Sequence, residues 1–148
     1  MDLPVYITTE EVQRVCMALE LGDWSMRSDS VVTAQEAEKI LNSLAIQDMQ
    51  IDLEDFRAGL EVELEHGTQN SDANVTNNHP ILTGKIVLAH LKETLDYYAR
   101  LEVAELEGDL FRTVSAIDGS KAQSYYKRLA EARRALAERE KSVIGDAG

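Results

Sequence analysis

Apolar positions near the start of the chain recur with the spacing of short helices. In residues 8–21, "TTEEVQRVCMALEL", the apolar side chains fall at intervals of three and four, which places them on one helix face. These side chains belong to Val12, Val15, Cys16 and Leu19. Thr8 followed by Glu11 has the form of a capping box, a typical helix start. Residues 33–46, "TAQEAEKILNSLAI", repeat the cap and the stripe. We therefore predict an N-terminal pair of capped helices.

The two segments align without gaps at an offset of 25 residues. Thr8 falls on Thr33, and Glu11 falls on Glu36. A duplicated helix-turn unit would produce this alignment. Two unrelated helices with ordinary caps would produce it as well, because a cap and a stripe fix most of the matched positions. Both interpretations stay open.

Two longer helices are predicted in the middle of the chain, at 52–67 and 80–108. Gly67 is a plausible C-terminal stop for the first, and Pro80 fits the first turn of the second. The polar loop 68–79 joins them. We expect the two helices to form a hairpin.

A narrow apolar seam runs along residues 121–143, after a connector at 109–119. The seam consists of Ala122, Tyr125, Leu129, Ala132, Leu136 and Val143. Such a seam is typical of a helix that packs against one partner helix. No strand-like alternation is visible anywhere in the sequence. The pattern predicts an all-α fold, a helical bundle of about five helices around a central helical hairpin, with a long C-terminal helix.

We expect one helical domain over 1–108, made of the N-terminal helix pair in 1–49 and a hairpin module in 50–108. The connector and a C-terminal interaction helix would occupy 109–148. A chain of 148 residues is long enough for a hydrophobic core of its own.

Composition and charge narrow the classes of function. A net charge of −12 argues against direct nucleic-acid binding, which requires concentrated Lys and Arg. No apolar run is long enough for a membrane span, and the N-terminus lacks a signal-peptide pattern. The single cysteine, Cys16, excludes an internal disulfide and lies on an apolar stripe, where we expect a buried thiol. We expect the protein in a virion or the bacterial cytoplasm.

Two histidine and glutamate pairs carry the strongest chemical signal. Glu63 precedes His66 by three residues on one helix of the hairpin, and His90 precedes Glu93 by three on the other. Carboxylate and imidazole at this spacing are the ligands of di-iron helical bundles. The hairpin supplies four ligands, so a dinuclear iron, manganese or zinc site would require a second copy of the chain.

An ordinary helix edge explains the same residues. Each histidine would bond a carboxylate, and Tyr97 or Tyr98 would cover it. The loop 68–79 is a weaker cation candidate: its oxygen-bearing side chains alternate as in a calcium loop, but Val75 and Ile81 stand where such a loop needs glycine and glutamate. Turn chemistry accounts for that loop equally well.

No pattern of an enzyme is visible. The sequence has no glycine-rich phosphate loop and no strand-to-helix serine elbow, and its only cysteine is on a core stripe. We therefore expect a protein without enzymatic activity.

The motifs "GLEVELEHG", "NVTNNHP", "LTGKIVLAHLKE" and "DYYARL" together resemble a family of small uncharacterised bacterial and phage proteins. The resemblance covers roughly residues 50–105 and implies a helical hairpin module without an assigned reaction. It places the two histidine and glutamate pairs within the family pattern. His79 replaces an acidic residue, which weakens a cation role for the loop, and Leu95 replaces a frequent proline, so we expect a straight helix there. Residues 1–49 and 109–148 would be additions that make contacts.

We expect a structural component of a large assembly, namely a bacteriophage virion protein at the head–tail connection or on the capsid. Other protein subunits would be its partners, homo-oligomerisation is expected, and both chain ends would be held by neighbouring subunits. A ferritin-like metal protein that dimerises is the alternative. A small acidic regulator that occupies a basic partner site is compatible with the charge but has no motif behind it.

Overall fold

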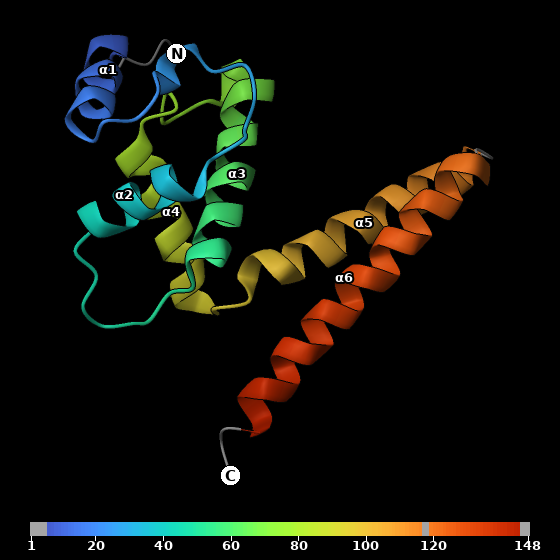
Figure 1. The fold of residues 1–148 in the computed structure, drawn as a ribbon. Helices are drawn as coiled ribbons and strands as arrows, with labels where there is room; N and C mark the ends of the chain where they lie inside the picture. Colours follow the sequence, from blue (N-terminus) through green and yellow to red (C-terminus); the bar gives the residue numbers. More distant parts are fainter. Residues whose placement is uncertain (1–5, 117–118, 146–148) are drawn as a thin grey trace. The chain divides into compact units, whose positions relative to one another are not determined.

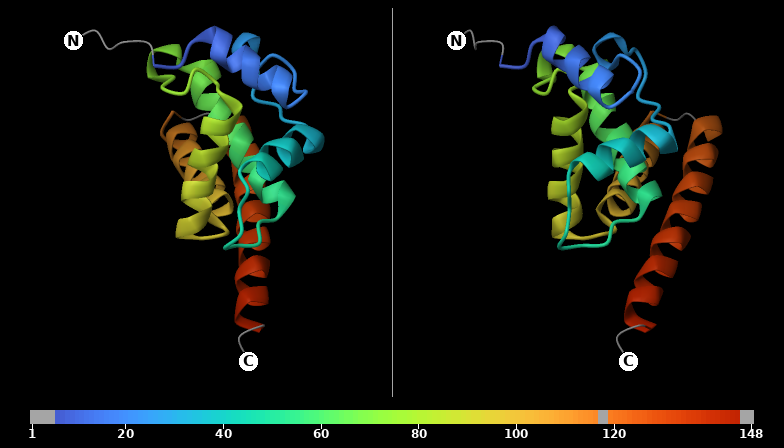
Figure 2. Two further views of the ribbon diagram at one scale, coloured as in Figure 1. Left: turned by 90° about the vertical axis from the view of Figure 1, so that its left-hand side faces the viewer. Right: turned by 60° about the vertical axis from the view of Figure 1, so that its left-hand side comes forward.

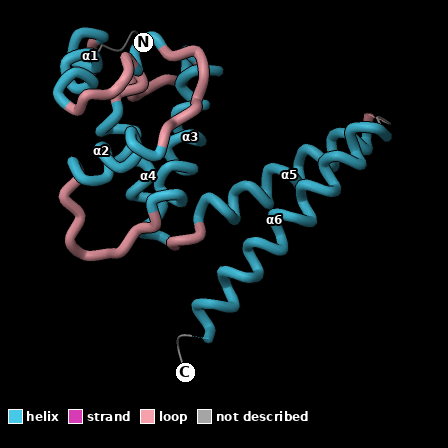
Figure 3. Tube along the Cα trace, in the orientation of Figure 1, coloured by secondary structure: helices cyan, strands magenta, loops and turns pink. Residues whose placement is uncertain are grey.

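The structure, a computed structural model, describes residues 6–116 and 119–145. Within these ranges it contains helices and turns and no strand (Figure 3), which confirms the all-α prediction. The α-helices are α1 (Thr9–Ala18), α2 (Ala34–Ser43), α3 (Leu53–Gln69), α4 (Pro80–Glu93), α5 (Tyr97–Ser115) and α6 (Gly119–Gly145), and the short 3-10 turns are η1 (Trp24–Met26) and η2 (Ser71–Ala73). The expectation about the two chain ends concerns 1–5 and 146–148, which lie outside the described residues.

The chain forms two compact units, residues 1–95 and 96–148. The division falls earlier than the boundary after 108 that the sequence suggested. The single helix expected over 80–108 is wrong, because α4 ends at Glu93 and α5 begins at Tyr97. Thr94 adopts extended backbone, with φ −161° and ψ 139°, a conformation that β-branched residues favour. The expectation of a straight helix through Leu95 is therefore also wrong.

The first unit is built around the hairpin of α3 and α4. These two helices lie side by side, α2 packs against both, and α1 packs against α4 (Figures 1 and 2). The core contains one large aromatic from each half of the unit and a set of aliphatic side chains. Its fully buried members include Val12, Trp24, Val32, Ile40, Phe56, Leu60, Leu64, Val87 and Leu91. The helical hairpin expected at the centre of this unit is present.

Close backbone approach explains a glycine in the middle of α4. A Cβ at Gly84 would lie 2.9 Å from Ile40 Cγ2 and 3.4 Å from the Phe56 ring. Real Cβ atoms rarely come so near, so a side chain at this position would push α2 and α3 away. Gly84 is the contact point that lets three helices share one core.

The two N-terminal helices match in their boundaries as well as in sequence. Thr8 and Thr33 cap α1 and α2, each of which has ten residues. Just beyond the C-caps, Glu20 and Ala45 both adopt left-handed backbone, with φ of 53° and 49°. The 25-residue similarity therefore includes the helix ends. Repetition and ordinary capping remain equally compatible with it.

Only the second capping box is complete. The Thr33 hydroxyl accepts from the Glu36 N–H at 3.2 Å, and the Glu36 carboxylate accepts from the Thr33 N–H at 3.0 Å. At α1 the Thr8 hydroxyl accepts from the Glu11 N–H, but the Glu11 carboxylate binds Arg14 instead. The capping box predicted at Thr8 is thus half formed.

Cys16 is buried, as its place on the apolar stripe predicted. Its side chain is 2% exposed, and its sulfur accepts from the Trp24 N–H at 3.5 Å. Burial raises the pKa of the Cys16 thiol, which disfavours the reactive thiolate.

The second unit is an antiparallel pair of helices, α5 and α6 (Figure 1). Leu106, Leu129 and Ala132 form its buried centre, flanked by half-buried Val103, Leu110 and Tyr125. The predicted seam of the C-terminal helix thus packs against α5 of the same chain; the side chain of Val143 lies outside the described residues. The connector expected at 109–119 is mostly helix, since α5 continues to Ser115. None of the described helices combines the length and the apolar content that crossing a bilayer requires.

Candidate functional site

Glu63 lies between two imidazoles in the α3–α4 hairpin. Its Oε1 atom is 3.6 Å from Nε2 of His90 on α4, and its Oε2 atom is 3.7 Å from Nδ1 of His66, one turn further along α3. The Glu63 side chain is only 13% exposed, against 30% for His90 and 62% for His66. The helical spacing and the hairpin together explain how residues distant in sequence meet here. We call Glu63, His66 and His90 the Glu63 cluster.

The fourth predicted residue is not part of this cluster. Glu93 is exposed near the end of α4 and forms no ion pair with any described residue. The two histidine and glutamate pairs therefore differ. The Glu63 carboxylate lies between two imidazoles, whereas the Glu93 side chain is exposed to solvent. The prediction that the hairpin would gather all four side chains is wrong for Glu93.

The distances within the cluster suit electrostatic contact more than hydrogen bonding. Both exceed 3.5 Å, beyond ordinary hydrogen-bond length. Within residues 6–116 and 119–145, no group of three or more His, Cys, Asp and Glu side chains is arranged so that it could hold a metal ion. The cluster contains one carboxylate and two imidazoles, a combination that holds zinc in some enzymes, but among the described residues these side chains are not arranged to hold an ion.

The polar loop after α3 is held by its own side chains. The Asn74 amide donates to the Gly67 carbonyl at 3.2 Å and to Asn78 Oδ1 at 3.0 Å. Asn77 and Asn78 both have left-handed backbone, with φ of 48° and 55°. These contacts are the turn chemistry that the sequence suggested. They engage oxygens that a calcium site would need as ligands.

Gly67 is not the helix stop that the sequence suggested, because α3 continues to Gln69. A Cβ at Gly67 would lie 2.1 Å from Asn78 Oδ1 and 3.0 Å from Asn74. The glycine therefore lets the loop pack onto the last turn of α3. Gly67 therefore allows the loop to approach α3 closely, and it does not end the helix.

Sequence reasoning missed a buried charge cluster beside the first two helices. Glu36 accepts from the Trp24 indole N–H at 3.2 Å and pairs with the Arg27 guanidinium, which also lies 5.0 Å from the centre of the Trp24 ring. The side chains of Glu36 and Arg27 are 12% and 17% exposed. Burial alone would raise the pKa of Glu36, but hydrogen bonds from Thr33, Trp24 and Arg27 together hold it below its usual value. The only signal in the sequence was a lone tryptophan within a polar loop.

His79 caps the N-terminus of α4. Its Nδ1 atom accepts from the Leu82 N–H at 3.4 Å, and its Nε2 atom lies 3.9 Å from Glu11 Oε1. The side chain is 9% exposed. Burial lowers the pKa of His79, although the nearby Glu11 carboxylate opposes this. The residue fits the helix-entry role that the sequence suggested.

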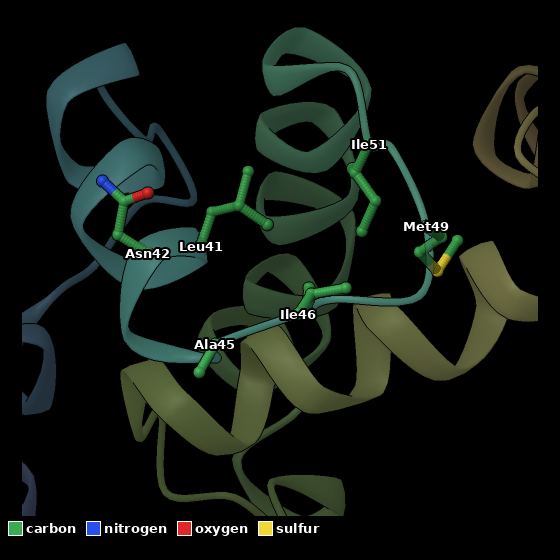
Figure 4. Close-up of a pocket in the computed structure, with 6 residues that line it drawn as sticks. All are labelled: Leu41, Asn42, Ala45, Ile46, Met49 and Ile51. Atoms are coloured by element: carbon green, nitrogen blue, oxygen red, sulfur yellow. The ribbon is translucent and has the colours of Figure 1, made fainter.

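A small pocket lies where α2 leads into the loop before α3 (Figure 4). Its volume is about 260 Å³, and the lining residues are Leu41, Asn42, Ala45, Ile46, Met49 and Ile51. Asn42 is the only one with a polar side chain. The lining contains no ionisable group, so this pocket offers no acid, base or nucleophile.

Comparison with known protein families identifies the family of the chain. A family model described as a protein of unknown function (DUF5661) matches residues 12–107. No curated protein and no solved structure matches the chain. The matched range begins within α1 and ends within α5. Residues 12–49 are thus part of the family domain, which corrects the expectation that the N-terminal helices are additions to it.

Proposed function

This chain belongs to the DUF5661 family of proteins of unknown function, and we propose that it is a non-enzymatic structural component of a large protein assembly. It would act through helix-mediated contacts with other protein subunits. The observation that carries the proposal is the small hydrophobic core of the second unit. At their centre its two helices bury Leu106, Leu129 and Ala132, and a core of that size gives a helix pair little stability of its own.

The same unit exposes large apolar side chains. Phe111 is 74% exposed, Val114 60% and Tyr126 66%. Large apolar side chains that gather on a protein surface mark contact sites. A helix pair with a small core and an uncovered apolar face is suited to bind another subunit.

The assembly that we propose is a bacteriophage virion, with the chain at the head–tail connection or associated with the capsid. Two features support this finer proposal: the resemblance of the central motifs to bacterial and phage proteins, and the net charge of −12. An acidic surface is complementary to basic partner subunits and speeds correct docking.

Co-sedimentation tests the proposal. Lysates of the source organism, with and without phage induction, would be separated on a density gradient, and the chain would be located by mass spectrometry. We expect it with particles of megadalton mass that resist a moderate salt wash. Recovery solely in the low-mass fractions, under both conditions, would contradict the proposal.

The Glu63 cluster supports a second candidate function, a ferritin-like metal protein completed by dimerisation. Glu63 would be a carboxylate ligand and His66 and His90 imidazole ligands, because their nitrogens already lie within 4 Å of its oxygens. Exposed Glu93 would be available to a site shared with a second copy. Iron, manganese or zinc would suit this ligand set.

Elemental analysis tests this candidate. The protein would be purified without chelators, alongside His90→Ala and the control Glu65→Gln, which alters an exposed carboxylate of α3 outside the cluster. Stoichiometric metal that disappears in His90→Ala and persists in Glu65→Gln would support the metal function. Absence of metal from the wild-type protein, even after incubation with Fe²⁺, Mn²⁺ or Zn²⁺, would exclude it.

A further inference from the structure

Ion pairs on one side of the α5–α6 hairpin define its register. Arg100 binds Glu140 at 2.9 Å, and Arg133 binds Glu107 at 2.5 Å. The second pair lies seven residues further along α5 and seven residues back along α6. This is the spacing of flanking positions in a coiled coil, where charged pairs bridge two helices.

The next position in this register is apolar. Another seven residues along α5 is Val114, and another seven back along α6 is Tyr126. Both are largely exposed, at 60% and 66%. Phe111, at 74% exposure, lies one turn before Val114 on the same flank. We call Phe111, Val114 and Tyr126 the tip patch, since they lie towards the end of α5 and the start of α6.

The area of the tip patch is within the range of the largest apolar patch on a typical monomer. A side chain of Phe or Tyr has about 150–250 Å² of surface, so three residues exposed to this degree present on the order of 350 Å². That is the size of a typical contact patch on a monomer. A shallow groove of about 580 Å³ borders Tyr126 and could receive an aromatic side chain. It is lined by Ser120, Gln123, Ser124, Tyr126, Lys127 and Ala130.

The charge distribution indicates what covers the patch. Residues 1–95 contain six Lys and Arg against seventeen Asp and Glu, a net charge of −11. Residues 96–148 contain nine against ten, a net charge of −1. Two copies that met through their first units would repel each other, whereas the second unit is almost neutral. Each ion pair beside the patch also presents both signs, so the face is complementary to itself.

We propose that two copies of this chain associate through the tip patch, each packing Phe111, Val114 and Tyr126 against the same residues of the other. The two hairpins would then form a four-helix arrangement, in which the apolar face of each pair is covered. Such a contact is isologous and closes as a dimer. The inference rests on the proposed function in that it names one subunit contact of the assembly.

The area of the patch limits the strength of this contact. Stable dimers bury about 800 Å² on each partner, and the tip patch supplies roughly half of that. The helix ridges beside it would provide the remainder. We therefore expect a dissociation constant in the micromolar range, about 1–50 μM, and little dependence on salt because the contact is mainly apolar.

Sedimentation velocity from about 1 to 200 μM tests the proposal. Wild-type protein should shift from the 16.5 kDa monomer to twice that mass as concentration rises. The double variant Val114→Glu/Tyr126→Glu should remain monomeric, with a dissociation constant raised at least about 100-fold. The matched control is Val75→Glu, which adds charge at a residue 84% exposed in the first unit and should dimerise as the wild type does.

Two results would overturn the proposal: a wild-type monomer over the whole range, or a double variant that still dimerises. A monomer would mean that no second copy of the chain covers the patch. If circular dichroism shows lost helix in the double variant, Phe111→Gln repeats the test without added charge. Co-sedimentation with particles is a separate measurement, so a dimer absent from particles would refute the assembly role alone, and a monomer present in particles would refute this inference alone.

Discussion

At the scale of single residues, several charged and polar side chains are largely buried, and most of them form hydrogen bonds or ion pairs with nearby residues. Helical spacing was sufficient to predict that Glu63, His66 and His90 share one side of the hairpin. It misplaced Glu93, because helical spacing alone does not tell whether the last residue of α4 faces the neighbouring helix or solvent. It also missed the contact of Glu36 with Trp24 and Arg27, since a loop brings these residues together and loops carry no periodicity.

Glu36 should contribute most to stability among the acidic residues of α2. Glu36→Ala leaves the Arg27 guanidinium and the Trp24 indole without their acceptor, and we expect a loss of about 2–4 kcal/mol in the free energy of unfolding. Glu38→Ala, an exposed neighbour on the same helix, should change stability by less than about 0.5 kcal/mol. Urea titrations followed by tryptophan fluorescence would measure both.

The difference between Glu36→Ala and wild type should depend on pH. The folded-state pKa of Glu36 lies below its usual value, so its contribution is fully present above about pH 4.5. It is lost as the pH falls through the folded-state pKa. Urea midpoints of the two proteins should therefore converge in acid; a constant difference from pH 7 to pH 3 would contradict this account.

His79 should make the first unit less stable in mildly acidic solution. Burial lowers its pKa, Nδ1 must be unprotonated to cap α4, and Arg14 and Glu11 are the charged groups that influence it. Because the unfolded chain binds the proton more readily, stability is full above about pH 6.5 and falls below it. His79→Asn keeps a capping acceptor that does not titrate, so its urea midpoint should change less between pH 8 and pH 5.5. Equal slopes for the two proteins would contradict this role.

At the scale of elements, helix starts were easier to predict than helix ends. Thr8, Thr33 and Asp52 all cap the helices that the sequence assigned to them, because side-chain capping is local. Gly67 and Thr94 were misread. A glycine inside a helix is explained only by the loop that packs on it, and the break at Thr94 interrupts an apolar pattern that continues on both sides.

Glycine substitutions in two helices should have opposite effects. Gly84→Ala gains helix propensity but overpacks the contact with Ile40, so we expect a net loss of about 1–3 kcal/mol in the free energy of unfolding. Gly108→Ala on α5 meets only the mobile Arg112 guanidinium and should stabilise its helix by up to about 1 kcal/mol. Thermal unfolding followed by circular dichroism would distinguish them. A stabilised Gly84→Ala variant would show that α2 and α4 are not tightly packed there.

At the scale of the whole molecule, the family match and the net charge are both unevenly distributed along the chain. The family match covers α2, α3 and α4 entirely and reaches into α5, while α6 lies beyond it. Nearly all of the net negative charge belongs to residues 1–95. The sequence showed the seam of α6 but not its partner. An apolar stripe indicates that a helix packs against another element, but it does not identify that element. In the structure, α5 is the helix that covers the seam of α6.

The reactivity of the buried Cys16 thiol can be used to measure how often the first unit opens. Its sulfur is shielded in the first unit, and its raised pKa keeps the thiolate scarce, so a thiol reagent reacts only when that unit opens. We expect no modification of the native protein by an aromatic disulfide reagent within minutes at pH 7.5, and one equivalent in denaturant. A cysteine introduced on the surface would then be the single labelled position, which gives access to spin or fluorophore probes without removal of the native thiol. Rapid labelling of the untreated protein would show that the first unit opens far more often than its packing implies.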